Sequence, residues 1–402
     1  MPSMPRIIAA ALIGSWCFVV PAASAEPAPG VSAGEIRIGQ TQPYSGPAAI
    51  FGAVGRAEAA YFKMINDEGG VNGRKIVLVS RDDHYNPDTT VALTKQLVEG
   101  DKVAAIFSVQ GAIPNLKIRD FLNQNGIPQL FTVTGAEIAG DTRHYPWTIG
   151  GAPLYRIEAQ IYARKILIDM PDAKIAVLYR NDNFGKSYLT GLRQVFGDSF
   201  DQRVVKIASY EESDASIAPQ LKALRDSGAN VLITAATAKH AIQAIEGVYD
   251  LGWHPTHFIT FTATSVPAVL APAGLDKAKG LISATSYLDP GDPRWTEDGS
   301  LKPYNSFVAK YLPGENPANA YLLTGYIEAQ AMVRVLKQCG DDLSRSNIMR
   351  QAANLKDFHP TGLLPGVGFF TSPRQYHPIV EAALERFNGQ RWELFGDVMA
   401  GH

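Results

Sequence analysis

The residues best suited to bind a ligand in this sequence are small or hydroxyl-bearing ones that directly follow short apolar runs. In an open α/β sheet, ligands bind outside the carboxyl ends of the strands, so such residues are the first candidates for contacts. Backbone N–H groups at glycine or alanine, with hydroxyl groups nearby, suit a carboxylate or carbonyl oxygen. The candidates of this kind are Ser45, Gln110, Gly111, Ala112, Val133, Thr134, Gly135, Thr237 and Thr262.

Aromatic residues are interleaved with these segments and could hold the apolar body of a ligand. They are Tyr44, Phe51, Tyr85, Phe184 and Tyr321. Any one of them alone is more typical of a core or a surface than of a binding site, but their joint placement favours a site.

No motif in the sequence supports catalysis. It has no Gly-x-Ser-x-Gly elbow, no Ser-x-x-Lys pairing, no phosphate-binding glycine-rich loop and no Gly-x-Gly-x-x-Gly after a predicted strand. His254 and His257 flank Pro255, which favours a turn over a zinc site. Asp82 and Asp83 are more typical of a solvated turn than of an acid–base pair. We therefore expect a protein that is not an enzyme and that needs no metal or cofactor.

The elements that must position these residues alternate between short Ile- and Val-rich runs and helical stretches. Continuous apolar runs separated by helices predict parallel strands buried on both faces, so the fold class is doubly wound α/β. One helix is expected to begin at Asn86-Pro87, a capping side chain followed by proline. The predicted strands are Ile36–Gly39, Ile76–Val79, Val103–Phe107, Gln129–Val133, Ile175–Tyr179, Val204–Ala208, Val231–Thr234 and Phe258–Phe261.

Turn-rich segments divide this pattern into two lobes. Glycine and proline interrupt regular structure over Tyr145–Pro153, and a second turn cluster lies within Ser283–Pro293. Two runs around Asn388-Gly389 predict a terminal hairpin, Glu381–Phe387 with Gln390–Phe395. Helices are expected over Leu301–Tyr311 and Asn319–Gln338. We expect lobe 1 to comprise residues 35–149 and 286–358, and lobe 2 residues 150–285 and 359–402.

Residues 1–25 have the pattern of a secretory signal peptide. Arg6 precedes an apolar run over Ile7–Val20, and Ala23-Ser24-Ala25 predicts cleavage before Glu26. Without Arg6, 36 basic and 39 acidic residues remain, a net charge of −3 without long runs of one sign, which argues against nucleic acid as a partner. Cys339 would be the one cysteine left, so no intramolecular disulfide is expected.

Linked stretches of the sequence also resemble the leucine/isoleucine/valine-binding protein family of periplasmic receptors. The stretches are Ile38–Pro47, Asn66–Ile76, Asp82-Asp83, Gly126–Pro128, Tyr179–Gly185 and Leu232–Ala236. The resemblance implies the type I periplasmic-binding-protein fold, with two Rossmann-like lobes joined by three crossovers that close on a ligand by a hinge. It also implies a periplasmic solute receptor of an ABC importer that docks on permease subunits in the inner membrane. We expect the receptor to be a monomer.

The resemblance further implies roles for particular residues. Gln110-Gly111-Ala112 and Val133-Thr134-Gly135 would hold a ligand carboxylate, and Phe51 and Phe184 would pack on the ligand. Amino-acid-binding members place an acidic residue where this sequence has Thr262, and a hydroxyl group cannot replace that charge on an ammonium. We therefore expect an aromatic or other apolar acid rather than an aliphatic amino acid.

Other interpretations stay open. Pro128–Ala136 resembles a branch of the family that includes receptors for plant-derived aromatic acids, while Arg180 is either a cation at the cleft or a solvated rim residue. The same clamp could report its ligand to a signalling partner instead of a transporter. An exported enzyme on this scaffold would need a nucleophile–base pair or a metal in its cleft.

Overall fold

The computed structural model of the protein describes residue 1 and residues 28–401. The predicted signal peptide and its cleavage site lie outside the described residues. In the part that is described, no helix is long and apolar enough to cross a membrane.

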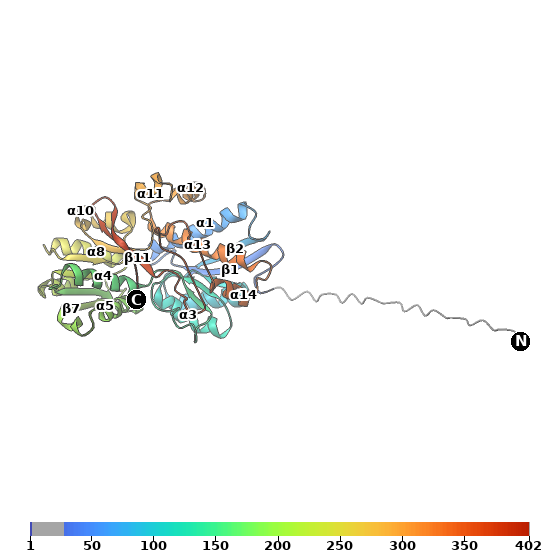
Figure 1. The fold of residues 1–402 in the computed structure, drawn as a ribbon, viewed down its shortest axis with the longest axis horizontal. Helices are drawn as coiled ribbons and strands as arrows, with labels where there is room; N and C mark the ends of the chain where they lie inside the picture. Colours follow the sequence, from blue (N-terminus) through green and yellow to red (C-terminus); the bar gives the residue numbers. More distant parts are fainter. Residues whose placement is uncertain (2–27, 402) are drawn as a thin grey trace.

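The chain forms two separate sheets, one in each lobe (Figure 1). The first is entirely parallel and has the order β2-β1-β3-β4-β5, and the second has the order β12-β11-β10-β9-β8-β6-β7. Strands of the first sheet are β1 (Glu35–Gln42), β2 (Lys75–Asp82), β3 (Ala105–Phe107), β4 (Gln129–Thr132) and β5 (Thr148–Gly150). Strands of the second are β6 (Ile175–Arg180), β7 (Val204–Tyr210), β8 (Val231–Ala235), β9 (Thr256–Ile259), β10 (Ile282–Thr285), β11 (Glu381–Phe387) and β12 (Trp392–Ala400). The predicted α/β class with parallel sheets in two lobes is confirmed.

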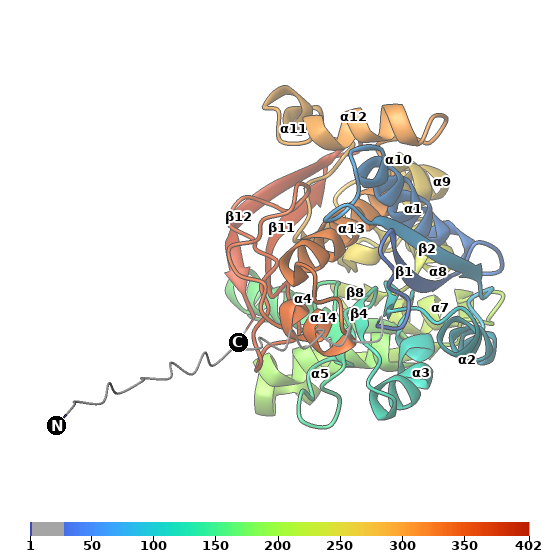
Figure 2. The same ribbon diagram turned by 90° about the vertical axis from the view of Figure 1, so that its right-hand side faces the viewer.

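Helices cover both sheets, as the two perpendicular views show (Figures 1 and 2). In the first half of the chain they are α1 (Gly52–Asp67), α2 (Pro87–Lys95), α3 (Ala112–Gln124), α4 (Tyr155–Asp169), α5 (Asn183–Phe196) and α6 (Phe200–Arg203). In the second half they are α7 (Ala218–Asp226), α8 (Ala238–Asp250), α9 (Ala271–Ala273), α10 (Leu275–Ala278), α11 (Pro293–Glu297), α12 (Lys302–Tyr311), α13 (Ala320–Cys339) and α14 (Arg345–Ala352). Short 3-10 turns are η1 (Ala49–Phe51), η3 (Gly197–Ser199) and η4 (Phe261–Ala263), and π turns are η2 (Gln96–Gly100) and η5 (Val266–Leu270).

Local sequence signals explain where several elements begin. The Asn86 side chain accepts hydrogen bonds from the N–H groups of Asp88 and Thr89, and Pro87 is the first residue of α2, as predicted. The terminal hairpin is also confirmed. It docks because β11 pairs antiparallel with β10, which supplies the partner that an isolated hairpin lacks.

Two strands lie inside segments that we predicted as irregular. β5 is three residues long and ends at Gly150, so the glycines and prolines around it hide its pattern. β10 lies in the segment predicted as the second crossing, which in the structure follows Thr285. The predicted strand over Phe258–Phe261 ends at Ile259, because Phe261 already belongs to the 3-10 turn η4.

The chain passes between the lobes three times: after β5, after β10 and before β11. Between the last two crossings it returns to the first lobe, where the α13 residue Tyr326 packs edge-on against Tyr61 of α1. The segment from residue 359 to 380 differs from our expectation, because its buried side chains join the core of the first lobe. Phe369, for example, packs on Phe131 of β4 with ring centroids 5.4 Å apart. We therefore propose that lobe 1 continues to about Ile379.

Candidate functional site

A cavity lies between the two lobes and is lined by residues from both. About 780 Å³ of space outside protein atoms lies within its bounds, open solvent included. First-lobe segments contribute η1 and the start of α13, and second-lobe segments contribute η4, β11 and β12. The first two crossings pass along it as well.

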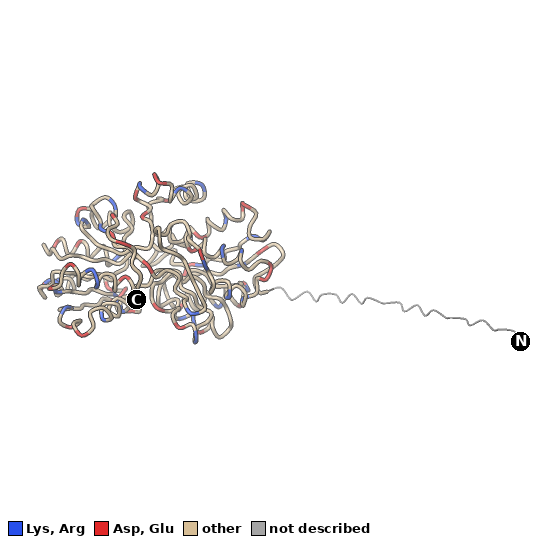
Figure 3. The backbone as a smooth tube through the Cα atoms, viewed as in Figure 1, with Lys and Arg blue, Asp and Glu red and all other residues tan. Residues whose placement is uncertain are grey.

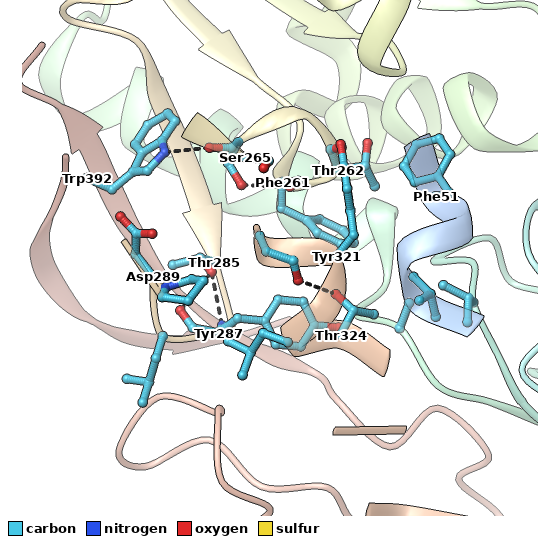
Figure 4. A pocket seen from close by; sticks show the side chains of 18 of the residues that line it. Phe51, Phe261, Thr262, Ser265, Thr285, Tyr287, Asp289, Tyr321, Thr324 and Trp392 are labelled. Atoms are coloured by element: carbon cyan, nitrogen blue, oxygen red, sulfur yellow. Dashed lines mark hydrogen bonds between the residues drawn. The ribbon is translucent and has the colours of Figure 1, made fainter. Parts of the chain in front are cut away.

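Aromatic rings form much of the cavity wall (Figure 4). Phe51 of η1 meets Tyr321 of α13 edge-on, with ring centroids 4.9 Å apart. On the other side, Tyr155 at the start of α4 stacks on Phe261 of η4 at 5.7 Å, and Phe261 lies 6.2 Å from Tyr287. Such a wall fits the apolar body of a small molecule, held between rings from opposite lobes.

Hydrogen bonds join the two lobes, among them the Arg156–Glu137 pair beside the first crossing and two bonds across the cleft. The Tyr321 hydroxyl donates to the Thr262 carbonyl oxygen over 2.9 Å, and Arg180 donates to the Tyr85 hydroxyl over 3.4 Å. Because Tyr321 and Tyr85 belong to the first lobe and their partners to the second, the structure is a closed arrangement of the two lobes.

A buried carboxyl group, Glu158 of α4, fixes the second-lobe wall. Its Oε1 accepts hydrogen bonds from the Phe261 N–H, over 2.8 Å, and from the Tyr162 hydroxyl, while Oε2 accepts from Tyr188. Burial raises the pKa of Glu158 to about 8. This network holds η4, and hence the ring of Phe261, in position.

Among the ionisable residues of the described cavity wall, acidic ones are present and basic ones are not. Asp289 and Glu385 line it, whereas no Lys, Arg or His among the described residues does. Burial raises the pKa of both carboxyl groups. The nearby carboxylates of Asp289 and Glu158 raise the pKa of Glu385 further. Four polar atoms of the wall have no hydrogen-bond partner within the described chain. They are Gln110 Oε1, Ser265 Oγ, Tyr287 OH and Asp289 Oδ2. The wall can therefore bind a ligand that has polar groups as well as an apolar body.

Five of the predicted site residues line this cavity. They are Phe51, Gln110, Val133, Thr262 and Tyr321. The structure places the others elsewhere in the molecule. Ser45 hydrogen-bonds to His84 on the rim, and Thr237 donates to Glu212 over 3.1 Å. Phe184 lies behind Tyr155, with ring centroids 4.7 Å apart, so it can act on a ligand in this cavity through that ring.

Most residues of the expected carboxylate-binding turns lie next to the cavity rather than in its wall. Gly111 and Ala112 begin α3, where a Cβ atom at Gly111 would come within 2.6 Å of the Tyr85 hydroxyl. Gly135 accepts a hydrogen bond from the Tyr155 N–H over 3.0 Å, and the Thr134 hydroxyl accepts one from Ala136. In this arrangement, Gln110 and Val133 alone among these residues reach the cavity.

Arg180 is buried but does not line the cavity. Its guanidinium group pairs with Asp182 at 2.7 Å and with Glu212 at 2.9 Å, and it lies 5.0 Å from the centre of the Phe184 ring. With two carboxylates bound, Arg180 connects the second lobe to Tyr85 rather than offering a free cation to a ligand.

Several wall residues were missed by the sequence analysis. They are Phe261, Tyr287, Asp289, Glu385 and Trp392, whereas Tyr155, for which the sequence left contact with a ligand open, also lines the wall. Tyr287 and Asp289 lie in the second crossing, and Glu385 and Trp392 belong to the terminal hairpin. They do not directly follow any predicted parallel strand, because β10 was not predicted and β11 and β12 form an antiparallel hairpin. The sequence indicates these residues in one way. They belong to the crossings and the hairpin, which must lie where the lobes meet.

The chain is similar to known proteins in sequence and in fold. A family model described as periplasmic binding protein matches residues 35–384. The Leu/Ile/Val-binding protein homolog 7 of Brucella abortus is 23% identical over 353 residues, which cover 83% of this chain and 84% of that protein.

Two solved structures share the fold. That of a branched chain amino acid ABC transporter from Thermus thermophilus with bound valine gives a TM-score of 0.82 at 16% identity, covering 92% of this chain and 97% of that one. That of an ABC transporter solute binding protein from R. palustris in complex with 4-hydroxybenzoate gives 0.77 at 17% identity, covering 91% and 97%.

Proposed function

The chain belongs to the periplasmic binding protein family, and on this premise we propose that it is the solute receptor of an ABC importer. It would capture a small organic molecule between its lobes and deliver it to permease subunits in the inner membrane. Export through a cleaved signal peptide at residues 1–25 would bring it to the periplasm, the compartment of this family. No catalytic step is part of this role.

The cavity between the lobes is the observation that carries the proposal. Its aromatic wall comes from both lobes, and the bond from Tyr321 to Thr262 joins the same two surfaces. A solute that touches both lobes binds the closed arrangement more tightly than the open one, and therefore shifts the population toward closure. Charged residues of both signs are scattered over the lobes (Figure 3), so contacts in the cavity rather than a single charged surface would select the solute.

The lining of the cavity favours a solute with an apolar body and polar groups. The preference for an aromatic acid over an aliphatic amino acid rested on the lack of an acidic residue at Thr262. Because Asp289 and Glu385 lie in the same cavity, that lack no longer argues against an amine. An aromatic acid remains a candidate that the following experiment includes.

A binding screen tests the proposed function. The purified protein is heated in the presence of aromatic acids, keto acids, amides, amines and amino acids, with sugars as the control class. At a 100-fold excess over its Kd, a solute that binds only the folded protein stabilises it by about 2.7 kcal/mol. We expect at least one of these classes, and not the sugars, to raise the melting temperature, with a matching heat in titration calorimetry. Absence of both signals for every class would contradict the receptor function.

A further inference from the structure

The two acidic residues of the cavity lie together at one end of it. Asp289 follows β10 in the second crossing, and Glu385 belongs to β11, whose register places it opposite Ser283 of β10. Figure 4 shows Asp289 and Trp392 at the end away from Phe51. The apolar body and the charged end of a solute would therefore meet different parts of the wall.

Among the described residues, neither carboxyl group has a cation as a salt-bridge partner. Glu385 is 3% exposed, and no donor in the described chain hydrogen-bonds to its side chain. The Gly291 N–H donates to Asp289 Oδ1 over 2.9 Å, and the N–H of Trp392 also favours the ionised form, yet no donor has hydrogen-bonding geometry with Oδ2. The nearby Arg294 is bound to Asp292 at 2.5 Å. Burial favours the neutral form of a carboxyl group that has no counter-ion, and an arriving cation would stabilise its ionised form.

A separate feature of the same cavity also points to a polar solute. Ser265 is 2% exposed, and its hydroxyl oxygen is buried with no hydrogen-bond partner in the described chain. Trp392 and Tyr287 add aromatic rings to the acidic end, and the Trp392 ring is held by a 2.8 Å bond to the Thr264 carbonyl oxygen. Aromatic faces attract cations, and a hydroxyl oxygen can accept a further N–H.

We propose that Asp289 and Glu385 form a subsite for a protonated nitrogen group of the solute, an ammonium or a guanidinium. The unpartnered Asp289 Oδ2 favours a group with N–H donors over a quaternary ammonium. The inference rests on the proposed receptor function and narrows its solutes to those that carry an amine. The proposed subsite lies at the second crossing and the terminal hairpin. The family resemblance had instead pointed to the position of Thr262 as the place for an ammonium partner.

A matched series of small molecules tests this subsite. Each apolar body, such as phenylethyl, isobutyl or butyl, is presented with an amine alone, a carboxylate alone, or both, and each compound is titrated by calorimetry. We expect the tightest member for a given body to carry an amine, and the acid without an amine to bind at least tenfold more weakly.

Three variants assign the preference to these residues. Glu385→Gln and Asp289→Asn keep the shape of each side chain and remove its charge, and each is expected to weaken amine binding at least tenfold. The control Glu381→Gln makes the same exchange on the same strand at a residue that does not line the cavity, and should change binding less than twofold. Thermal unfolding of each variant, expected at or above the wild-type melting temperature, verifies folding.

The outcomes separate this inference from the receptor function. Acids that bind as tightly as the matched amines, or amine binding unaffected by both substitutions, would overturn the acidic subsite and leave the receptor function standing. Tighter binding of a quaternary ammonium than of the primary amine would overturn the N–H assignment. If no compound of any head group binds, the receptor function fails together with the subsite.

Discussion

Phe51 and Phe184, both predicted to contact a ligand, have different surroundings in the folded protein. Phe51 lines the cavity and packs on Tyr321, which bonds across the cleft. Phe184 is 2% exposed and packs against Tyr155 and Tyr188 inside the second lobe. One ring is therefore available to a solute, and the other supports a ring that is.

Substitution of each phenylalanine should separate these roles. Phe51→Ala is expected to weaken solute binding by about 1–3 kcal/mol, because it removes apolar contact area from the cavity wall. Phe184→Ala is expected to lower the free energy of unfolding by about 3–5 kcal/mol, because it leaves a hole in the core. Calorimetry and chemical denaturation of both variants measure the two quantities. A larger effect of Phe184→Ala than of Phe51→Ala on binding, measured where both proteins are folded, would contradict these assignments.

The sequence predicted individual residues of the cavity wall when these residues follow parallel strands. Gln110, Val133 and Thr262 reach the cavity because the carboxyl ends of parallel strands face the cleft. The same rule does not find Asp289, because the preceding strand β10 was not predicted, or Glu385, which lies on an antiparallel hairpin. Their relevance depends on how the lobes come together, and no local pattern in the chain encodes that arrangement.

Among the elements, the segment between Phe358 and Val380 shows how much depends on long-range packing. It has no helix or long strand, yet the Tyr376 carbonyl oxygen accepts a hydrogen bond from Gly150 at the end of β5, over 2.9 Å. Next to it, His377 is 6% exposed, and neither ring nitrogen has a hydrogen-bond partner in the described chain. This segment therefore secures the strand from which the first crossing leaves.

Acid should lower the stability of the folded protein through the buried ring of His377. Burial lowers the pKa of His377 to about 4, whereas an unfolded histidine has a pKa near 6.5, so the unfolded chain binds more protons between these values. The stabilising effect of the neutral ring is complete above pH 6.5 and is lost as the pH falls toward 4. Between pH 7 and pH 4.5 we expect wild type to lose about 2–3 kcal/mol more stability than His377→Gln.

Chemical denaturation at the two pH values measures this difference. His254→Gln, at an exposed histidine, is the matched control and should follow the wild type. Equal losses in wild type and His377→Gln would show that His377 is not held neutral by its surroundings.

Element types were largely predictable, and element positions less so. Strands with four or more apolar residues and the capped start of α2 have strong local signals, and they were predicted. β5 was missed because three residues beside glycine carry too little pattern, and its stability comes from β4 and Tyr376. The lobe to which residues 359–380 belong is set by contacts such as Phe369 with Phe131, more than 200 residues apart in sequence.

The molecule as a whole is a clamp whose two halves meet around the cavity. Tyr321 with Thr262 and Arg180 with Tyr85 are polar contacts across the cleft, each with a modest net free energy. A bound solute that touches both walls adds to these contacts, and closure would follow from that addition. The two-lobed fold of the periplasmic binding protein family could be predicted from the alternation of strands and helices, whereas the solute depends on side chains that the crossings and the hairpin bring together.

A crystal structure of the protein with the tightest solute from the binding screen tests the central claim most directly. The account predicts electron density for the solute in the cavity, within contact distance of Phe51 from the first lobe and Phe261 from the second, with the lobes closed as they are here. A solute bound outside this cavity, or one that touches the side chains of a single lobe, would contradict it.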